Sequence, residues 1–303
     1  MLQCCLYACT DVIIRAESFG AVDIDALRQK ARTALQRMRI HKSDTGIEWD
    51  RVMVFPQGRF SSASLLALQR EAYLAAVNSG IASTDRPELN RLGDLLRPAS
   101  QAYGGVPLFK RHYPKELLPF ALDLFLGKQV LITEHHTYFR SGYDEAAAFA
   151  AKLKAIEPRL SWATLGHTLR NAVQQRSGPW GNELRAYTDE VHLSQPGDES
   201  KSYLLIKHET DPASVSSVMV NGRPADYRVA DDRVELEVSV LGECRVEVQR
   251  HPPAPFKASV PSVAYLAKVA ARRYVSELRD NVLAPNARLL PAPLARRVNL
   301  DWQ

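Results

Sequence analysis

Three ionisable residues stand side by side at Glu134, His135 and His136, directly after a short apolar run. A carboxylate beside an imidazole can hold one tautomer of the ring, raise its basicity or complete a metal site. Residues two apart on a strand share a face, so Glu134 and His136 would point one way and His135 the other. Either histidine can face a ligand where the strand end twists. The alternative is a polar strand end whose side chains only satisfy nearby backbone groups.

This cluster lies within the stretch from Gln129 to Gly142, around which the chain is organised. Val130 to Ile132 predicts a strand, and a loop with a glycine leads from it into a helix that begins near Asp144. In folds that alternate strands and helices, ligands bind at the carboxyl ends of the strands. We therefore expect the three ionisable residues to be catalytic.

An earlier strand, from Arg51 to Phe55, ends in a turn made of Pro56, Gln57 and Gly58. A single glycine cannot cradle a phosphate, but a turn of this kind can present a side chain and a backbone amide to a ligand. A helix opened by the serines at 61 and 62 follows this turn. The pattern strand, loop, helix therefore occurs here as well.

The flanking segments complete an α/β pattern. The segment from Ser79 to Lys128 is rich in proline and glycine and predicts long loops, from which His112 can reach a site. A surface position for His112 is the alternative. The other predicted elements are strands at 9–14, 74–77 and 161–165, and helices from Asp25, around 89–96 and 117–126, at 144–156 and from 166 to about 175.

After residue 176 the pattern changes to alternating apolar and polar segments between Glu183 and Arg250. Asn221-Gly222 between two of these segments is a strong hairpin signal. The predicted fold is α/β, with a partial (β/α) barrel-like parallel sheet and covering helices in residues 1–176. A small antiparallel β-sandwich in 183–250, a proline-rich linker in 251–261, and a C-terminal helix with a basic tail in 262–303 follow it.

The composition is that of a globular protein. The chain has 303 residues, of which 46% are hydrophobic and 24% charged, a length that suits two domains. No apolar run is long enough to span a bilayer, and no basic region precedes the apolar start as in a signal peptide. Cys4, Cys5, Cys9 and Cys244 show no zinc-site spacing, so we expect reduced thiols and a cytoplasmic location.

Charge is concentrated at the C-terminal end. From residue 257 to the end there are eight Lys or Arg against three Asp or Glu, a difference equal to the whole net charge of +5. No nucleic-acid-binding motif accompanies this basic segment, so we expect no nucleic acid partner. One hypothesis is that the C-terminal helix docks to a partner or a membrane surface.

The sequence also lacks the nucleophile-elbow, phosphate-loop, dinucleotide and HExxH motifs.

Two stretches resemble carbohydrate deacetylases of the NodB type and related glycoside-hydrolase barrels. VMVFPQGRFSSASLLALQREAYLAAVNS is similar to the part of that family in which a strand delivers an R-x-P-Y-G-like turn, and VLITEHHTYF is similar to its late strand with a Leu-Leu-His-like motif. The similarity covers roughly residues 51–165. It implies that Pro56, Gln57 and Gly58 line the substrate groove and that His135 or His136 assists the leaving group.

The family's two metal-binding motifs, T-F-D-D-G and H-[ST]-x-x-H, do not occur in this sequence. Gln57 also stands where the family has an aromatic residue, and Phe55 where its arginine-containing motif begins. A divalent metal such as zinc is expected in a complete member, where a metal-bound water attacks an acetyl group. The chain opens as if within a domain, so we expect the C-terminal part of a longer enzyme or a degenerate descendant.

The resulting hypothesis is a carbohydrate-active, deacetylase-like hydrolase that acts on acetylated cell-surface or exported polysaccharide, with His112 and Trp162 among its substrate-binding residues. The alternative is a non-catalytic carbohydrate-binding protein. In that hypothesis the β domain and the aromatic residues Trp162, Trp180 and Tyr187 bind sugar, because aromatic faces stack on sugar rings. The sequence predicts neither which sugar is bound nor the oligomeric state.

Overall fold

The computed structural model describes residues 23–55, 58–89, 91–139, 142–178, 181–252, 263–278, 282, 283, 286 and 291. The predicted strand at 9–14 and the residues Pro56, Gln57 and Trp180 lie outside these ranges. The chain divides into two compact units, Met1–Phe256 and Lys257–Gln303. No helix among the described residues is long and apolar enough to cross a membrane.

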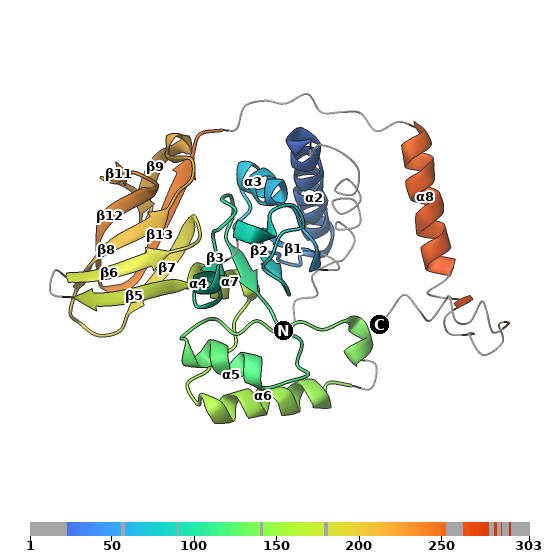
Figure 1. The fold of residues 1–303 in the computed structure, drawn as a ribbon, viewed down its shortest axis with the longest axis horizontal. Helices are drawn as coiled ribbons and strands as arrows, with labels where there is room; N and C mark the ends of the chain where they lie inside the picture. Colours follow the sequence, from blue (N-terminus) through green and yellow to red (C-terminus); the bar gives the residue numbers. More distant parts are fainter. Residues whose placement is uncertain are drawn as a thin grey trace. The chain divides into compact units, whose positions relative to one another are not determined.

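The fold is mixed α/β, with helices and both parallel and antiparallel strands (Figure 1). The helices, including short 3-10 turns marked η, are α2 (Ile24–Thr45), α3 (Ser62–Arg70), η3 (Pro87–Leu89), α4 (Leu92–Leu95), α5 (Leu118–Phe125), η4 (His136–Phe139), α6 (Asp144–Ile156), α7 (Leu165–Arg170), η5 (Pro212–Ser214) and α8 (Val263–Leu278). The strands of the first sheet are β1 (Val52–Val54), β2 (Ala75–Asn78), β3 (Ala99–Ser100) and β4 (Leu108–Lys110).

Local sequence signals account for the helices that flank this sheet. The Asp23 side chain accepts hydrogen bonds from the N–H groups of Asp25 and Ala26, so α2 begins with a satisfied N-cap. Leu27 and Leu35 lie on the buried face of α2. The helix ends at Gly46, which adopts the left-handed conformation at a φ of 69°. The predicted helices at 144–156 and around 117–126 are also confirmed as α6 and α5.

The first sheet has the order β1-β2-β4-β3, and β1, β2 and β4 run parallel. Side chains alternate between its two faces. Met53, Ala76 and Leu108 pack into one apolar cluster with α2 and α3. Val77 and Phe109 pack on the opposite face with Leu169 of α7 and with Tyr187. The sheet is therefore covered on both faces, as its apolar strands require.

No closed barrel is present in the described part of the chain. The helix that connects β1 to β2, α3, covers one face of the parallel strands. The opposite face is the one that a barrel would turn toward its interior. Leu169, Ala172 and Tyr187 fill that side, so the strands form an open sheet.

The predicted strand at Val130–Ile132 is wrong as a full strand. Only an isolated parallel bridge joins Ile132 to His112, through hydrogen bonds from His112 N to Leu131 O and from Thr133 N to His112 O, each 2.9 Å. The reason lies in β3, which pairs with Leu108 and Phe109 of β4. Strand β4 therefore has only a short free edge with which residues 130–132 can pair.

The predicted strand from Ser161 to Leu165 is also wrong. Residues 161–164 form no strand, and Thr164 caps α7 by accepting a hydrogen bond from the His167 N–H at 3.3 Å. Residues 161–163 are exposed, so they have no apolar face for a sheet to bury. The predicted helix to about residue 175 ends at Arg170, and β5 begins at Val173.

The second half of the first unit contains two sheets. The first, β10-β9-β13-β7, uses β10 (Arg223–Ala225), β9 (Val215–Val220), β13 (Gly242–Arg250) and β7 (Glu190–Gln195). The second, β11-β12-β8-β6-β5, uses β11 (Arg228–Ala230), β12 (Arg233–Val240), β8 (Lys201–His208), β6 (Gly181–Ala186) and β5 (Val173–Gly178). Inward side chains of both sheets meet in one apolar cluster.

In this β region one sequence prediction is confirmed and another is wrong. The Asn221-Gly222 hairpin is confirmed, since β9 and β10 pair antiparallel and both turn residues have positive φ. The pairing is not wholly antiparallel as predicted, because β6 and β8 run parallel. The connection between β6 and β8 passes through β7, a strand of the other sheet, and this passage allows the parallel direction.

Candidate functional site

The parallel strands bring several predicted residues to one edge of the first sheet. Because β1, β2 and β4 share a direction, the residues that follow them emerge together at the carboxyl edge. These residues are Gly58 after β1, Asn78 at the end of β2, and His112 after β4. The bridge at Ile132 adds Glu134 and His135 to the same edge. We refer to this set as the carboxyl edge.

Asn78 ties the first two strand ends together. Its Nδ2 donates hydrogen bonds to the carbonyl oxygens of Gly58, at 2.9 Å, and Gly80, at 2.8 Å. The Asn78 side chain is buried, and its Oδ1 has no hydrogen-bond partner among the described residues. A buried acceptor without a partner is uncommon in a folded protein, but this atom is covered by its neighbours and not open to a ligand. Gly58 itself has a φ of +67°, which favours glycine.

His112 is held in place by an ionised carboxylate. Its Nε2 lies 3.0 Å from Oδ2 of Asp123, whose other oxygen lies 2.8 Å from Lys128 Nζ. Burial favours a neutral Asp123, but hydrogen bonds from His112 and Lys128 outweigh it and lower the pKa of this carboxyl. The imidazole also packs edge-on against Phe120. This arrangement fixes the orientation of the ring at the carboxyl edge.

Glu134 and His135 lie in the polar segment after the bridge. The Glu134 Oε2 accepts a hydrogen bond from the His135 N–H at 3.0 Å, and the His135 ring lies 5.9 Å from the ring of Tyr113. Burial and the nearby carboxylates of Glu145 and Glu134 raise the pKa of Tyr138. Acidic, imidazole and phenol groups are therefore neighbours here. The side chain of His136, at the start of η4, lies outside the described part.

The other predicted aromatic residues are not gathered at the carboxyl edge. Trp162 lies between α6 and α7 with 58% of its surface exposed. Tyr187 is only 1% exposed and packs into the core beneath the first sheet. Its predicted role in stacking on sugar is therefore wrong, because its ring faces no solvent.

The described residues do not fit a zinc site. No group of three or more His, Cys, Asp or Glu side chains among them lies close enough together to hold a metal ion. At the carboxyl edge, His112 pairs with Asp123, and the described His and acidic side chains form no group of three that could hold a metal ion. The described part of the chain accordingly gives no support to the zinc that the family resemblance implies.

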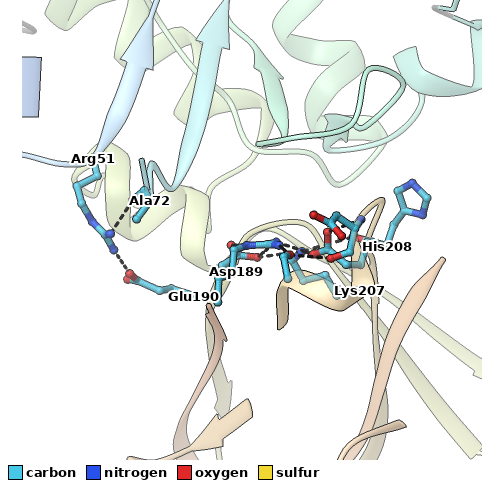
Figure 2. A network of polar contacts seen from close by, with 10 residues as sticks. Arg51, Ala72, Asp189, Glu190, Lys207 and His208 are labelled. Carbon is cyan, nitrogen blue, oxygen red and sulfur yellow. Dashed lines mark hydrogen bonds and ion pairs between the residues drawn. The ribbon is translucent and has the colours of Figure 1, made fainter. Parts of the chain in front are cut away.

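A network of charged residues that the sequence analysis did not identify joins the two halves of the first unit. Arg51 of the first sheet donates hydrogen bonds to the Ala72 carbonyl, at 2.6 Å, and to Glu190 of β7 (Figure 2). Arg170 also binds Glu190, at 2.8 Å, and Asp50 accepts a hydrogen bond from the Gly166 N–H at 2.8 Å. These contacts position β7 against the first sheet.

The adjacent part of the network is largely buried and balanced in charge. Lys207 Nζ lies 2.9 Å from Asp189 and 3.1 Å from Glu209, and Arg250 binds the same two carboxylates at 2.8 and 2.5 Å. Figure 2 shows Asp189 and Lys207 in close contact. Burial opposes ionisation of Asp189, but the charges of Lys207 and Arg250 prevail and lower its pKa to about 2.

The sequence contains a signal for this cluster. Tyr203, Leu205 and Lys207 alternate on β8, and the first two are buried, so Lys207 also points inward and needs acidic partners. With every charge paired, the cluster has the character of a structural network. The carboxyl edge, where Glu134 and His135 are half-buried and open in part to solvent, is the better candidate for binding.

Comparison of the chain with family models, curated proteins and solved structures finds no match in any of the three.

Proposed function

We propose that the chain is a carbohydrate-active protein that engages an acetylated polysaccharide at the carboxyl edge. The observation that carries the proposal is the bridge between His112 and Ile132, which adds Glu134 and His135 to the edge formed by the parallel strands. Polar groups at this position suit a ligand that is rich in hydroxyl and acetyl oxygens.

The arrangement of the strands supports the deacetylase-like part of the proposal. β1, β2 and β4 are neighbours in the order of the sequence, with Ile132 bridged beyond His112, and a (β/α) barrel uses the same order. The two later sheets enclose a common apolar core, as in a β-sandwich. The proposed ancestor is accordingly a barrel-type deacetylase with an appended sandwich.

The side chains at the edge have complementary roles in this proposal. The neighbouring rings of Tyr113 and His135 contact a sugar face. In hydrolysis of an O-acetyl ester, Glu134 takes a proton from the water whose oxygen bonds to the acetyl carbon. His135 gives a proton to the sugar oxygen as its bond to the acetyl carbon breaks. The products are acetate and a free hydroxyl.

The test is acetate release from O-acetylated xylo-oligosaccharides and from N-acetylated chitooligosaccharides by the full chain. Release is expected from at least one substrate, and the His135→Ala/His136→Ala double variant is expected to lose it. His251→Ala is the control, because that residue is exposed and far along the sequence from the edge. Release that survives in the double variant would remove the histidines from the mechanism.

The second candidate is a non-catalytic carbohydrate-binding protein. The observation that favours it is a large polar groove in the β region, separate from the carboxyl edge and lined by amide and charged side chains. Binding of the same oligosaccharides without acetate release, in both the wild-type chain and the double variant, would select this candidate over the hydrolase.

A further inference from the structure

The polar groove lies on the outward face of the five-stranded sheet. Its volume is about 510 Å³, within the range of small-ligand sites. The inward face of the same strands carries Leu184, Leu205 and Leu236 into the apolar core, so the residues that alternate with them point outward. The groove is lined by Gln174, Gln175, Arg176, Glu183, Arg185, Ile206, His208, Asp232 and Arg233.

Strand register sets the centre of the groove. Gln174 of β5 pairs with Arg185 of β6, and Arg185 pairs with Ile206 of β8, so the three lie in one row across the sheet. In Figure 1 these strands run side by side in the β region. Gln174 accepts a hydrogen bond from the Tyr187 hydroxyl through Oε1, which leaves its NH₂ group to donate to a ligand.

Arg185 is the cation at the centre of this row. It is half-buried, and its guanidinium lies 5.9 Å from the centre of the Tyr187 ring. Among the described residues it forms no ion pair with a carboxylate. An aromatic ring at this distance stabilises and orients a guanidinium but leaves its N–H donors available.

The other charges of the groove are largely matched by neighbours. His208 Nδ1 lies 3.0 Å from Asp232, and Arg233 lies 3.7 Å from Glu235. Arg176 stands directly across from Glu183 in the β5–β6 register. Arg185 forms no ion pair among the described residues, although Glu183 lines the same groove, and it stands in a row with an amide donor and an aliphatic side chain.

We propose that this groove binds a carboxylate-bearing sugar, a uronate unit of an acidic polysaccharide. The guanidinium of Arg185 forms paired hydrogen bonds with the uronate carboxylate, as planar guanidinium groups do. Gln174 donates to a ring hydroxyl, and Ile206 contacts the apolar face of the sugar. The inference rests on the proposed carbohydrate function and narrows its ligand to the acidic class, but it concerns a different site.

The experiment is calorimetric titration of the full chain with trigalacturonate, with a neutral galactose trisaccharide and with inorganic phosphate. Saturable binding of trigalacturonate is expected, with at least tenfold weaker binding of the other two. Arg185→Gln is expected to weaken trigalacturonate binding about 10- to 100-fold, because it removes a charge-assisted hydrogen bond. Its far-ultraviolet spectrum and melting temperature should match the wild type.

Arg223→Gln is the matched control. It removes the same charge from an exposed position on β10, in the other sheet. An equal loss of affinity in Arg223→Gln, equal binding of the neutral trisaccharide, tight binding of phosphate, or no binding of trigalacturonate would each overturn the inference.

The His135→Ala/His136→Ala variant separates this inference from the proposed function. It should bind trigalacturonate like the wild type, because its substitutions lie at the carboxyl edge. Loss of acetate release with intact uronate binding would support both proposals together. Loss of uronate binding in this variant would contradict a separate groove.

Discussion

Among the described residues, buried charged side chains lie beside residues of opposite charge. Lys207 occupies an inward position of β8, and Glu209 is fully buried two residues later. Desolvation of these groups is offset by Asp189 and Arg250, so the cluster is neutral as a whole. Alternation along β8 predicts that Lys207 points inward. The sequence does not predict Arg250 as a partner, because 41 residues separate it from Glu209.

Neutralising one member of the cluster should destabilise the fold. Glu209→Gln keeps the shape of the side chain but leaves Lys207 and Arg250 with a single carboxylate. We expect the free energy of unfolding to fall by about 3 kcal/mol, measured by urea denaturation. The control is Glu199→Gln, an exposed residue in the loop before β8, which should change stability little. Equal losses in the two variants would contradict the role of the cluster.

Stability should also depend on acid pH through Asp189. Its pKa is lowered from 3.8 to about 2 in the folded chain, so its contribution is fully present above pH 4. That contribution, about 2 kcal/mol, is lost as the pH falls toward 2. Measured from pH 5 to 2, the stability difference between the wild type and Asp189→Asn should shrink. A constant difference would show that folding does not lower the pKa of this carboxyl.

At the scale of elements, local signals predicted helices and hairpins better than strand pairing. The N-cap at Asp23 and the Asn221-Gly222 turn depend on neighbouring residues alone, and both are present. The apolar run at 130–132 has the composition of a strand, yet β3 occupies most of the edge it would need. Whether such a run pairs in a sheet depends on segments far away in the sequence. Its own pattern of apolar residues therefore does not predict the pairing.

Gly105, in the loop before β4, lies where this loop approaches α3 closely. A Cβ atom on Gly105 would lie 2.4 Å from the Leu65 carbonyl oxygen in α3, and its φ is +69°. Gly127 has a similar φ of +66° but open space around it. Gly105→Ala should therefore lose about 3 kcal/mol or more, against about 1 kcal/mol for Gly127→Ala. Similar values in denaturant titrations would mean that the backbone yields easily.

At the scale of the whole molecule, the first unit combines two kinds of sheet. Tyr187 follows β6 of the β region, and its ring packs with Phe109, Leu169 and other residues around the first sheet. The network of Arg51 and Glu190 links the same two parts. Sequence patterns depend on nearby residues and predict these two parts as separate domains. Contacts between segments far apart in the sequence leave no periodic signal.

Replacing Tyr187 should lower the stability of the whole first unit. Truncation by Tyr187→Ala removes a fully buried ring, and we expect a loss of about 3–5 kcal/mol in unfolding free energy. Tyr187→Phe keeps the ring and loses only the hydrogen bond to Gln174, so about 1 kcal/mol is expected. Two variants of equal stability would contradict the packing role.

The candidate site was predictable in part. Gly58, His112 and Glu134 were predicted because strand ends in α/β folds collect ligand-binding groups, and the parallel pairing brings their segments to one edge. The unpartnered oxygen of Asn78 and the groove around Arg185 were not predicted. Both depend on the register between strands far apart in the sequence, which determines the neighbours of each side chain.

We would test carbohydrate binding first, by calorimetric titration of the full chain with O-acetylated oligogalacturonate. This ligand offers acetyl groups for the carboxyl edge and carboxylates for the groove. We expect saturable binding that weakens at least tenfold in a chain carrying Arg185→Gln together with His135→Ala and His136→Ala, while Arg223→Gln binds like the wild type. No binding by the wild-type chain, or equal binding by the combined variant, would contradict this expectation.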